Sequence, residues 1–240
     1  MHNSLVMSIL CYKNNKYSTL NKVLTFFVVK NPCNLKTKQL QNSYLCKRKN
    51  NNDFTMIIDE RTTRVERLRQ VAEQMMTAAR TAPKGKGVDI MEIALVEGDT
   101  IHKLSDEMLK YSQKTGLKFI TRDAENILNA EAIVLIGTKT HTHGLNCRYC
   151  GFDTCEEKLR HEAVPCTINS VDVGIAVGAA CSVAADCRVD NRVMFSVGRV
   201  AQEMGLMSEC SSIFGIPISC TSKNPFFDRI SKTPAPPDLP

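Results

Sequence analysis

The sequence predicts one domain of the α/β (α+β) class, and two observations lead to this prediction. First, segments with the i, i+3, i+4 apolar spacing of amphipathic helices alternate along the chain with short strand-like segments. Second, residues 132–137, AIVLIG, form a continuous apolar run, which is typical of a central strand that is buried on both faces. The chain shows no internal repeat, so these elements are expected to form a single packed unit.

The first part of this domain is predicted to begin with a long helix. Residues 59–80 place apolar side chains on one helical face, and Pro83 and Gly85 end the helix. The members of that face are Val65, Leu68, Ala72, Met75 and Ala79. The elements that follow are a strand from residue 88 that turns at Gly98-Asp99, a helix over 101–113, a short strand over 117–121, and a small helix through 127 and 128.

After the central strand, a polar loop at 139–146, KTHTHGLN, leads to a cluster of cysteines. A helix over 155–163 follows, capped by Asp153 or Thr154. Residues 170–187 are rich in Gly and Ala, which predicts a buried helix or a helix at which two copies of the chain meet. A further helix starts at Asp190 and ends at Gly205, and residues 211–219 resemble a last strand.

Charge is distributed unevenly along the chain. The net charge is +6, but residues 1–55 hold eight Lys, one Arg and a single acid, Asp53, whereas the remainder holds 22 basic and 24 acidic residues. The domain itself is therefore nearly neutral, and we expect neither a nucleic-acid nor a membrane partner. The apolar run VLTFFVV at 23–29 is too short to span a bilayer, and no signal-peptide cleavage site follows it.

The composition changes abruptly at Met56, and this change sets the predicted boundaries. Residues 1–55 are expected to be either upstream sequence that is not part of the native protein, with Met56 as the true start, or a disordered basic tail. Residues 56–230 form the domain, and residues 231–240 form a Pro-rich tail. Because no export signal is found, a cytoplasmic location is expected.

Four cysteines are the strongest chemical signal in the sequence. Cys147, Cys150, Cys155 and Cys166 have the spacing C-x2-C-x4-C-x10-C. Disulfides are not expected in a chain without an export signal. Zinc is a serious alternative, because it binds four Cys or three Cys and one His, and His141, His143 and His161 lie nearby in the sequence. The spacing favours a [4Fe–4S] cluster, and a [2Fe–2S] cluster is a further alternative.

The motif CRYCGFDTC followed by Cys166 resembles the four-cysteine cluster domain of the electron-transport-complex ferredoxin subunit and of the corrinoid iron–sulfur protein. The last gap, of ten residues, is shorter here. More broadly, residues 56–230 resemble a bacterial and archaeal family of uncharacterised ferredoxin-domain-containing proteins. ARTAPKGKGVD at 79–89, the CxxCGxxxC motif and the segment over 172–206 carry that resemblance. It implies an iron–sulfur cluster but no particular reaction.

A second resemblance is to nitroreductases, through AARTAPKGKG, the Gly/Ala segment and GLMSECSSIFGIP. It implies a nitroreductase-like mixed sheet with packed helices, into which the four-cysteine loop is inserted, and an FMN-binding dimer. Arg80, Lys84 and Lys86 would then bind the FMN phosphate, although basic residues also suit any helix C-terminus. An Arg-rich phosphate motif like that of nitroreductases is missing here, with RTTR at 61–64 a poor substitute.

The remaining domain cysteines are Cys181, Cys187, Cys210 and Cys220, and burial as small apolar residues explains them most simply. The leading hypothesis is therefore an iron–sulfur redox protein that transfers electrons through one cluster, in the form of a flavin-linked reductase if FMN binds. A redox partner protein or a small-molecule electron acceptor is the expected partner. The alternative is a non-enzymatic zinc-binding or structural module that uses the same four cysteines. Catalytic residues cannot be named from the sequence.

Overall fold

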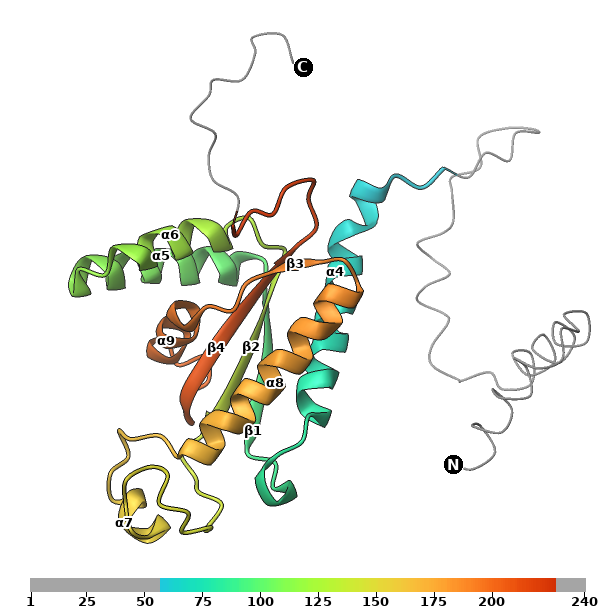
Figure 1. The fold of residues 1–240 in the computed structure, drawn as a ribbon. Helices are drawn as coiled ribbons and strands as arrows, with labels where there is room; N and C mark the ends of the chain where they lie inside the picture. The colour runs from blue at the N-terminus through green and yellow to red at the C-terminus, as the bar shows by residue number, and fades with distance from the viewer. Residues whose placement is uncertain (1–56, 228–240) are drawn as a thin grey trace, which may run out of the picture. The chain divides into compact units, whose positions relative to one another are not determined.

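The computed structural model describes residues 57–227 (Figure 1). The elements in chain order are α4 (Glu60–Thr81), the short 3-10 helix η1 (Gly85–Gly87), β1 (Met91–Glu97), α5 (Asp99–Thr115), α6 (Lys118–Ile127), β2 (Ala132–Lys139), α7 (Cys155–Leu159), α8 (Thr167–Asp186), β3 (Asp190–Asn191), α9 (Phe195–Glu203) and β4 (Cys210–Ser219). The predictions made for the N-terminal extension, for a start at Met56 and for the Pro-rich tail lie outside the described residues.

The four strands form one sheet with the order β1-β2-β4-β3. Helices and strands build the domain together, so the α/β (α+β) class is confirmed. Every strand pair in the described residues is antiparallel, so the sheet is antiparallel and not mixed as expected. The first pairing has a clear cause. Helices α5 and α6 pack together and meet at Gly116, a left-handed helix end, so the chain returns to the end of the sheet that it left and β2 runs back along β1.

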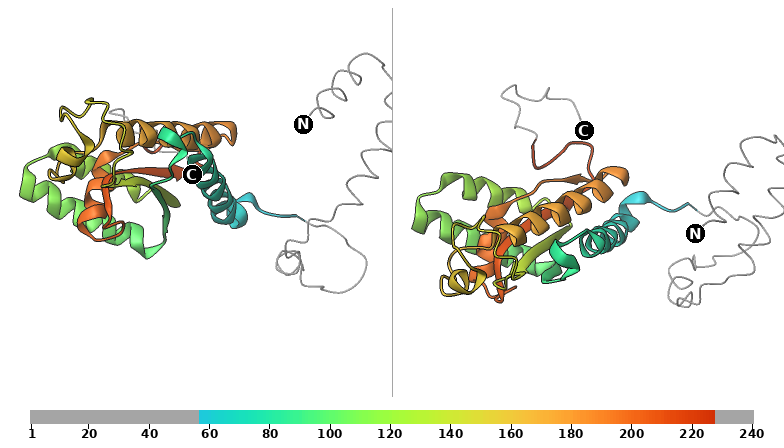
Figure 2. Two further views of the ribbon diagram at one scale, coloured as in Figure 1. Left: turned by 90° about the horizontal axis from the view of Figure 1, so that it is seen from below. Right: turned by 60° about the horizontal axis from the view of Figure 1, so that its bottom comes forward.

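Helices cover both faces of the sheet (Figures 1 and 2). Helices α4 and α8 pack on one face in a first core that includes Val134 and Ile136 of β2. Helices α5, α6 and α9 build a second core on the other face, which includes Ile133 and Leu135. Because alternate residues of β2 enter different cores, the strand is buried up to its last residue, Lys139, and the central strand predicted from its continuous apolar run is confirmed.

Helix α4 confirms most of the predicted helical face. Asp59 caps its N-terminus by accepting a hydrogen bond from the backbone N–H of Arg61 at 3.0 Å. Leu68, Ala72, Met75 and Ala79 are buried. Val65 is 61% exposed, so its assignment to the buried face was wrong: the helix extends beyond the sheet at this end.

Three element boundaries differ from the prediction. Residues 117–121 were expected to form a strand, but Leu117 is the N-cap of α6 and the other four lie in this helix, because Ile120, Ala124 and Ile127 recur at helical spacing and are buried together. The helix expected from residue 190 begins at Phe195, because residues 190 and 191 pair with β4 as strand β3. The helix expected over 155–163 ends at Leu159, with Thr154 as its N-cap.

Helix α8 is the Gly/Ala-rich segment, and it carries the residues that position the candidate site. Within the described residues it is the one helix long and apolar enough to cross a membrane, with a mean hydropathy of 1.6. A core helix meets the same criterion of length and composition. Here α8 packs along α4 and buries Asn169, Asp172, Val173, Ala176, Ala180 and Ala184.

Candidate metal centre

The cysteines lie where the sequence places them, in a long loop between β2 and α8. Residues 140–166 form this cysteine loop, which contains α7 and lies at one end of the sheet (Figure 1). Cys147, Cys150 and Cys155 are half-buried, and Cys166 is buried as the N-cap residue of α8. Three thiols therefore come from the middle of the loop, while the fourth lies at its end, at the N-cap of a core helix.

The backbone of the cysteine loop has an unusual number of left-handed residues. Gly144, Asn146, Arg148 and Gly151 all have positive φ, with values of 65°, 48°, 65° and 87°. Left-handed residues at intervals turn successive N–H groups toward a common concave side, as in the backbone nests that bind anions and iron–sulfur clusters. A non-glycine residue adopts this conformation only at a cost in free energy, so its repetition at 146 and 148 indicates a shaped loop.

Asn146 and Cys155 hold the two ends of the motif together. The backbone N–H of Asn146 donates to Cys155 Sγ at 3.3 Å, and the N–H of Cys155 donates to Asn146 Oδ1 at 2.8 Å. An N–H group that donates to a cysteine sulfur stabilises the thiolate form that a metal needs. This reciprocal pair brings Asn146, the neighbour of Cys147, against Cys155, which is nine residues further along the chain.

The four sulfurs do not form a closed set in this conformation. Across residues 57–227, no three His, Cys, Asp or Glu side chains lie close enough together to hold a metal ion, and all eight cysteines are free. The donor set nevertheless suits a soft, thiolate-ligated metal, because four thiols, an N–H···S bond and the left-handed turns lie in one loop. The assignment of the four cysteines as ligands thus stays a prediction.

Lys158 is a feature of the loop that sequence reasoning missed. Its residue is only 1% exposed, although it lies on α7 between Cys155 and Cys166. A buried ammonium group lowers the free energy of negative charge close to it.

His161, one of the three histidines near the cysteines in the sequence, stacks on Phe152 with ring centroids 4.8 Å apart.

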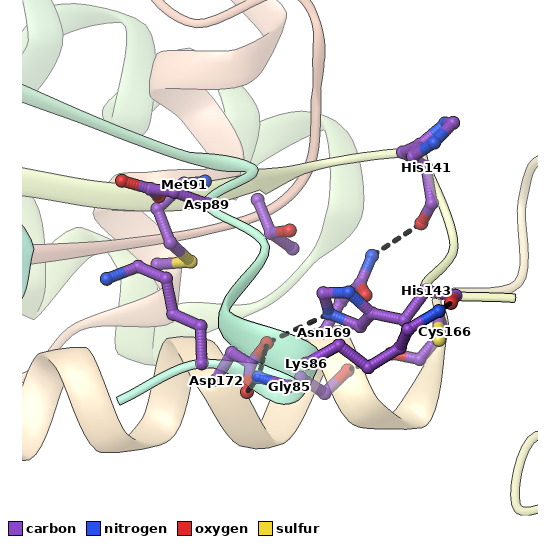
Figure 3. A network of polar contacts seen from close by, with 12 residues as sticks. Gly85, Lys86, Asp89, Met91, His141, His143, Cys166, Asn169 and Asp172 are labelled. Atoms are coloured by element: carbon purple, nitrogen blue, oxygen red, sulfur yellow. Dashed lines mark hydrogen bonds and ion pairs between the residues drawn. The ribbon is translucent and has the colours of Figure 1, made fainter. Parts of the chain in front are cut away.

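His143, which precedes the cysteines, is part of a buried polar network (Figure 3). Its Nε2 lies 3.0 Å from Asp172 Oδ2, and the two side chains are 1% and 4% exposed. The backbone N–H of Gly85 donates to both oxygens of Asp172, at 3.0 and 3.1 Å. Sequence reasoning did not find this pair, although one signal was available, since an acid in the apolar part of a helix usually has a buried partner.

The three cations proposed for a flavin phosphate each have a protein acceptor. Arg80 Nη1 donates to Asp89 Oδ2 and to the carbonyl of Met91, both at 2.8 Å. Lys84 Nζ caps the end of α4 through the carbonyls of Arg80 and Ala82, and Lys86 Nζ donates to the carbonyl of His143 at 3.0 Å. The structure therefore gives these residues a structural role, and phosphate binding by them stays a prediction.

A cleft of about 660 Å³ lies beside the cysteine loop. Its walls come from the start of β1, the end of β2, α7 and the residue before β4, and are Asp89, Ile90, Glu92, Lys139, Thr140, His141, Leu159 and Glu209. Lys139 bridges Glu92 and Glu209 at 3.0 and 2.9 Å, and these two carboxylates raise the pKa of its ammonium group. The walls carry three carboxylates, those of Asp89, Glu92 and Glu209, and one lysine. This excess of negative charge makes the cleft unfavourable for a phosphate group.

Among the cysteines outside the loop, Cys181 and Cys210 are protected thiols, whereas the expectation of burial was wrong for Cys187. Burial raises the pKa of the Cys181 thiol. Burial, together with the nearby carboxylates of Glu92 and Glu209, raises the pKa of Cys210 to about 11. Cys187, by contrast, is exposed at the end of α8. Burial as small apolar residues thus explains Cys181 and Cys210.

Comparison with known proteins identifies the family. Residues 162–229 match the family described as "Uncharacterized protein containing a ferredoxin domain (DUF2148)". An uncharacterized protein of Archaeoglobus fulgidus is 35% identical over 185 residues, which cover 74% of this chain and 100% of the relative. The chain belongs to this family. The resemblance predicted from the sequence is confirmed, and the ferredoxin domain in the family's description indicates a redox function.

Solved structures with a similar arrangement are flavoproteins and nitroreductases. A BluB-like flavoprotein from Clostridium difficile 630 is 17% identical, with a TM-score of 0.46 over 76% of this chain and 88% of that chain. The nitroreductase CinD from Lactococcus lactis, in complex with chloramphenicol, is 14% identical, with a TM-score of 0.47 over 75% and 86%.

Proposed function

We propose that the protein is an iron–sulfur redox protein that transfers electrons through one [4Fe–4S] cluster held by Cys147, Cys150, Cys155 and Cys166. The observation that carries the proposal is the cysteine loop itself: four thiols on one loop, with a backbone N–H donated to Cys155 Sγ. The ferredoxin domain of the family supports the same function. When bound, such a cluster accepts and releases single electrons.

The residues of the loop have distinct tasks in this proposal. Asn146 holds Cys155 through its reciprocal hydrogen bonds, and Gly151 allows the turn between the second and third ligands. Lys158 is buried on α7 between the third and fourth ligands, where an ammonium group would favour the negative charge of the thiolates. Cys166 is bound rigidly because α8 packs in the first core, so the other three ligands adjust to it.

The cleft beside the loop gives a small-molecule electron acceptor a place to bind. Its volume of about 660 Å³ lies in the range of small-molecule sites. Leu159 of α7 lines the cleft, so an acceptor there would contact the cysteine loop directly. The carboxylates of the cleft favour a neutral or cationic acceptor over a phosphorylated one.

An anaerobic ultraviolet–visible spectrum of the full chain, with iron, sulfide and zinc assayed on the same sample, tests the proposal. We expect a broad band near 400 nm and about four irons per chain. Cys150→Ser should lose most of the iron. Cys187→Ser is the matched control, because Cys187 is exposed and lies outside the loop, and it should keep the iron of the wild type.

Each result decides between stated alternatives. Zinc without iron would overturn the redox proposal and leave the zinc-binding module on the same cysteines. Full iron content in Cys150→Ser would overturn the ligand assignment. Flavin absorbance in the same spectrum would add FMN as a second cofactor and make a flavin-linked reductase the activity to assay.

A further inference from the structure

The buried network around His143 lies between the two parts of the candidate metal centre. His143 precedes Cys147 by four residues on the cysteine loop, and its partner Asp172 lies on α8, the helix whose N-cap is Cys166 (Figure 3). The hydrogen bond between His143 and Asp172 therefore joins the segment that carries the first three cysteines to the helix that carries the fourth.

Asn169 makes a second connection of the same kind. It lies one turn before Asp172 on the buried face of α8, and it is 1% exposed. Its Nδ2 donates to the carbonyl of His141 at 2.6 Å and, more weakly, to the carbonyl of Lys139 at 3.4 Å. The start of the cysteine loop is thus fixed to the first turns of α8 by two side chains, Asn169 and Asp172.

The η1 segment closes the network from the other side. Gly85 donates its N–H to Asp172, and Lys86 Nζ donates to the carbonyl of His143. The approach is close: a Cβ on Gly85 would lie 2.7 Å from Ile168 Cγ2 and 3.2 Å from His143 Cδ2. Only glycine fits at this position without displacement of its neighbours.

The network contains polar atoms that simple stabilisation of the core does not explain. His143 Nδ1 and Asn169 Oδ1 are two of the four buried side-chain atoms in the described residues that have no hydrogen-bond partner. A buried polar atom without a partner costs about 1–3 kcal/mol. A functional role is one of the explanations for such atoms in a native structure, and these two lie within the cysteine loop and on the helix that follows it.

We propose that His143 and Asp172 are positioning residues for the metal centre: they hold the first three cysteine ligands at a fixed distance from Cys166. A carboxylate only accepts hydrogen bonds, so with Asp172 in its carboxylate form the donor of this pair is His143 Nε2. Outer residues that fix a ligand segment in this way govern metal retention and the reduction potential. This inference rests on the proposed function, since it assumes that the four cysteines bind a metal.

The test compares His143→Leu with His143→Gln in the full chain. Leucine removes the donor, while glutamine keeps an N–H donor close to the position of Nε2. The rate of metal release to a chelator should rise about 10- to 100-fold in His143→Leu and stay near the wild-type rate in His143→Gln. The midpoint potential and the electron paramagnetic resonance spectrum should change in His143→Leu and stay close to those of the wild type in His143→Gln.

Ser196→Ala is the matched control. Ser196 is also fully buried, and its hydroxyl donates to Asp123 Oδ2 at 2.6 Å, but this pair lies among the helices of the second core. The substitution should lower stability to unfolding and leave metal release unchanged. If His143→Leu does not fold, Asp172→Asn takes its place, with the same expected acceleration and nearly the same side-chain volume.

The two proposals fail in different ways. Equal release rates in the wild type and His143→Leu, an equal acceleration by Ser196→Ala, or failure of His143→Gln to restore retention would overturn the positioning role. Zinc in place of iron in the wild type would overturn only the redox function, since release rates can be compared for either metal. A wild-type chain that holds neither metal would overturn both.

Discussion

At the scale of single residues, the chemical character of a side chain depends on where the fold places it. Cys150 and Cys210 are both cysteines of the same domain. Cys150 is half-exposed in a loop with left-handed turns, whereas Cys210 is 1% exposed and begins the buried strand β4. The first is available to a metal, and the second behaves as a small apolar residue with a protected thiol.

The Cys210 thiol predicts a dependence of stability on pH. Burial and the carboxylates of Glu92 and Glu209 raise its pKa from about 9 to about 11, so the folded state binds this proton more tightly than the unfolded chain does. The stabilisation of the folded state by the protonated Cys210 thiol is therefore complete below pH about 9 and is lost as the pH rises toward 11. Urea unfolding of the wild type and of Cys210→Ala should show a difference in stability that narrows between pH 8 and pH 10.5. A constant or widening difference would contradict the assignment.

The sequence predicted the chemistry of individual residues better than their partners. The four cysteines could be selected because their spacing is local. The His143–Asp172 pair could not, since it joins residues 29 positions apart and depends on the packing of α8. The basic residues of the segment after α4 were recognised, but their acceptors are backbone carbonyls, and a sequence pattern does not indicate which carbonyls are near.

At the scale of elements, the closest approaches at glycines in residues 57–227 lie between α9 and β4. A Cβ added to Gly198 would lie 1.9 Å from the carbonyl oxygen of Ile213, and one added to Gly215 would lie 2.3 Å from Val197 Cγ1. The helix and the strand therefore approach at a distance that only glycine permits. This contact places α9 against the middle of the sheet and completes the second core.

Gly198→Ala should consequently destabilise the protein by about 1–3 kcal/mol, the usual cost of an overpacked core. Gly178→Ala is the control: Gly178 lies on an exposed face of α8 with open space around it, so alanine should stabilise that helix by about 0.5–1 kcal/mol. The free energies of unfolding in urea measure both effects. Two substitutions of the same sign would show that helix propensity, rather than packing, governs position 198.

Periodicity predicted the long elements correctly and failed for the short ones. Helices α4 and α5, the central strand β2 and the last strand β4 were confirmed, because each contains enough residues to show its period. Residues 117–121 were assigned to a strand because five residues rich in aromatic and β-branched side chains fit either structure. These residues form a helix because α6 packs along α5 in the second core.

At the scale of the whole domain, the two cores are independent of the cysteine loop. The buried clusters on the two faces of the sheet include no residue from 140 to 165. The loop is therefore attached to a scaffold whose own apolar surface is buried without any contribution from the loop. A metal in the loop should stabilise the loop itself and contribute little to the packing of the sheet.

Removal of the metal with a chelator should thus have a local effect. We expect hydrogen exchange of backbone amides to become faster across residues 140–166, while the amides of β2 and β4 keep their protection. Mass spectrometry of peptides from the loaded and the stripped protein measures both regions in one experiment. Faster exchange throughout the sheet after metal removal would mean that the loop is needed for the core to remain folded.

The hydrogen bonds from Asn169 to the carbonyls of Lys139 and His141 also have a consequence for protein engineering. They close the loop at its base, so the point where the chain leaves β2 and the point where it enters α8 are held together whatever lies between them. Changing the length of a loop whose ends are already joined costs little in chain entropy. Residues 144–165 could therefore be exchanged for a binding loop of another length, and the domain would serve as a carrier for grafted metal sites.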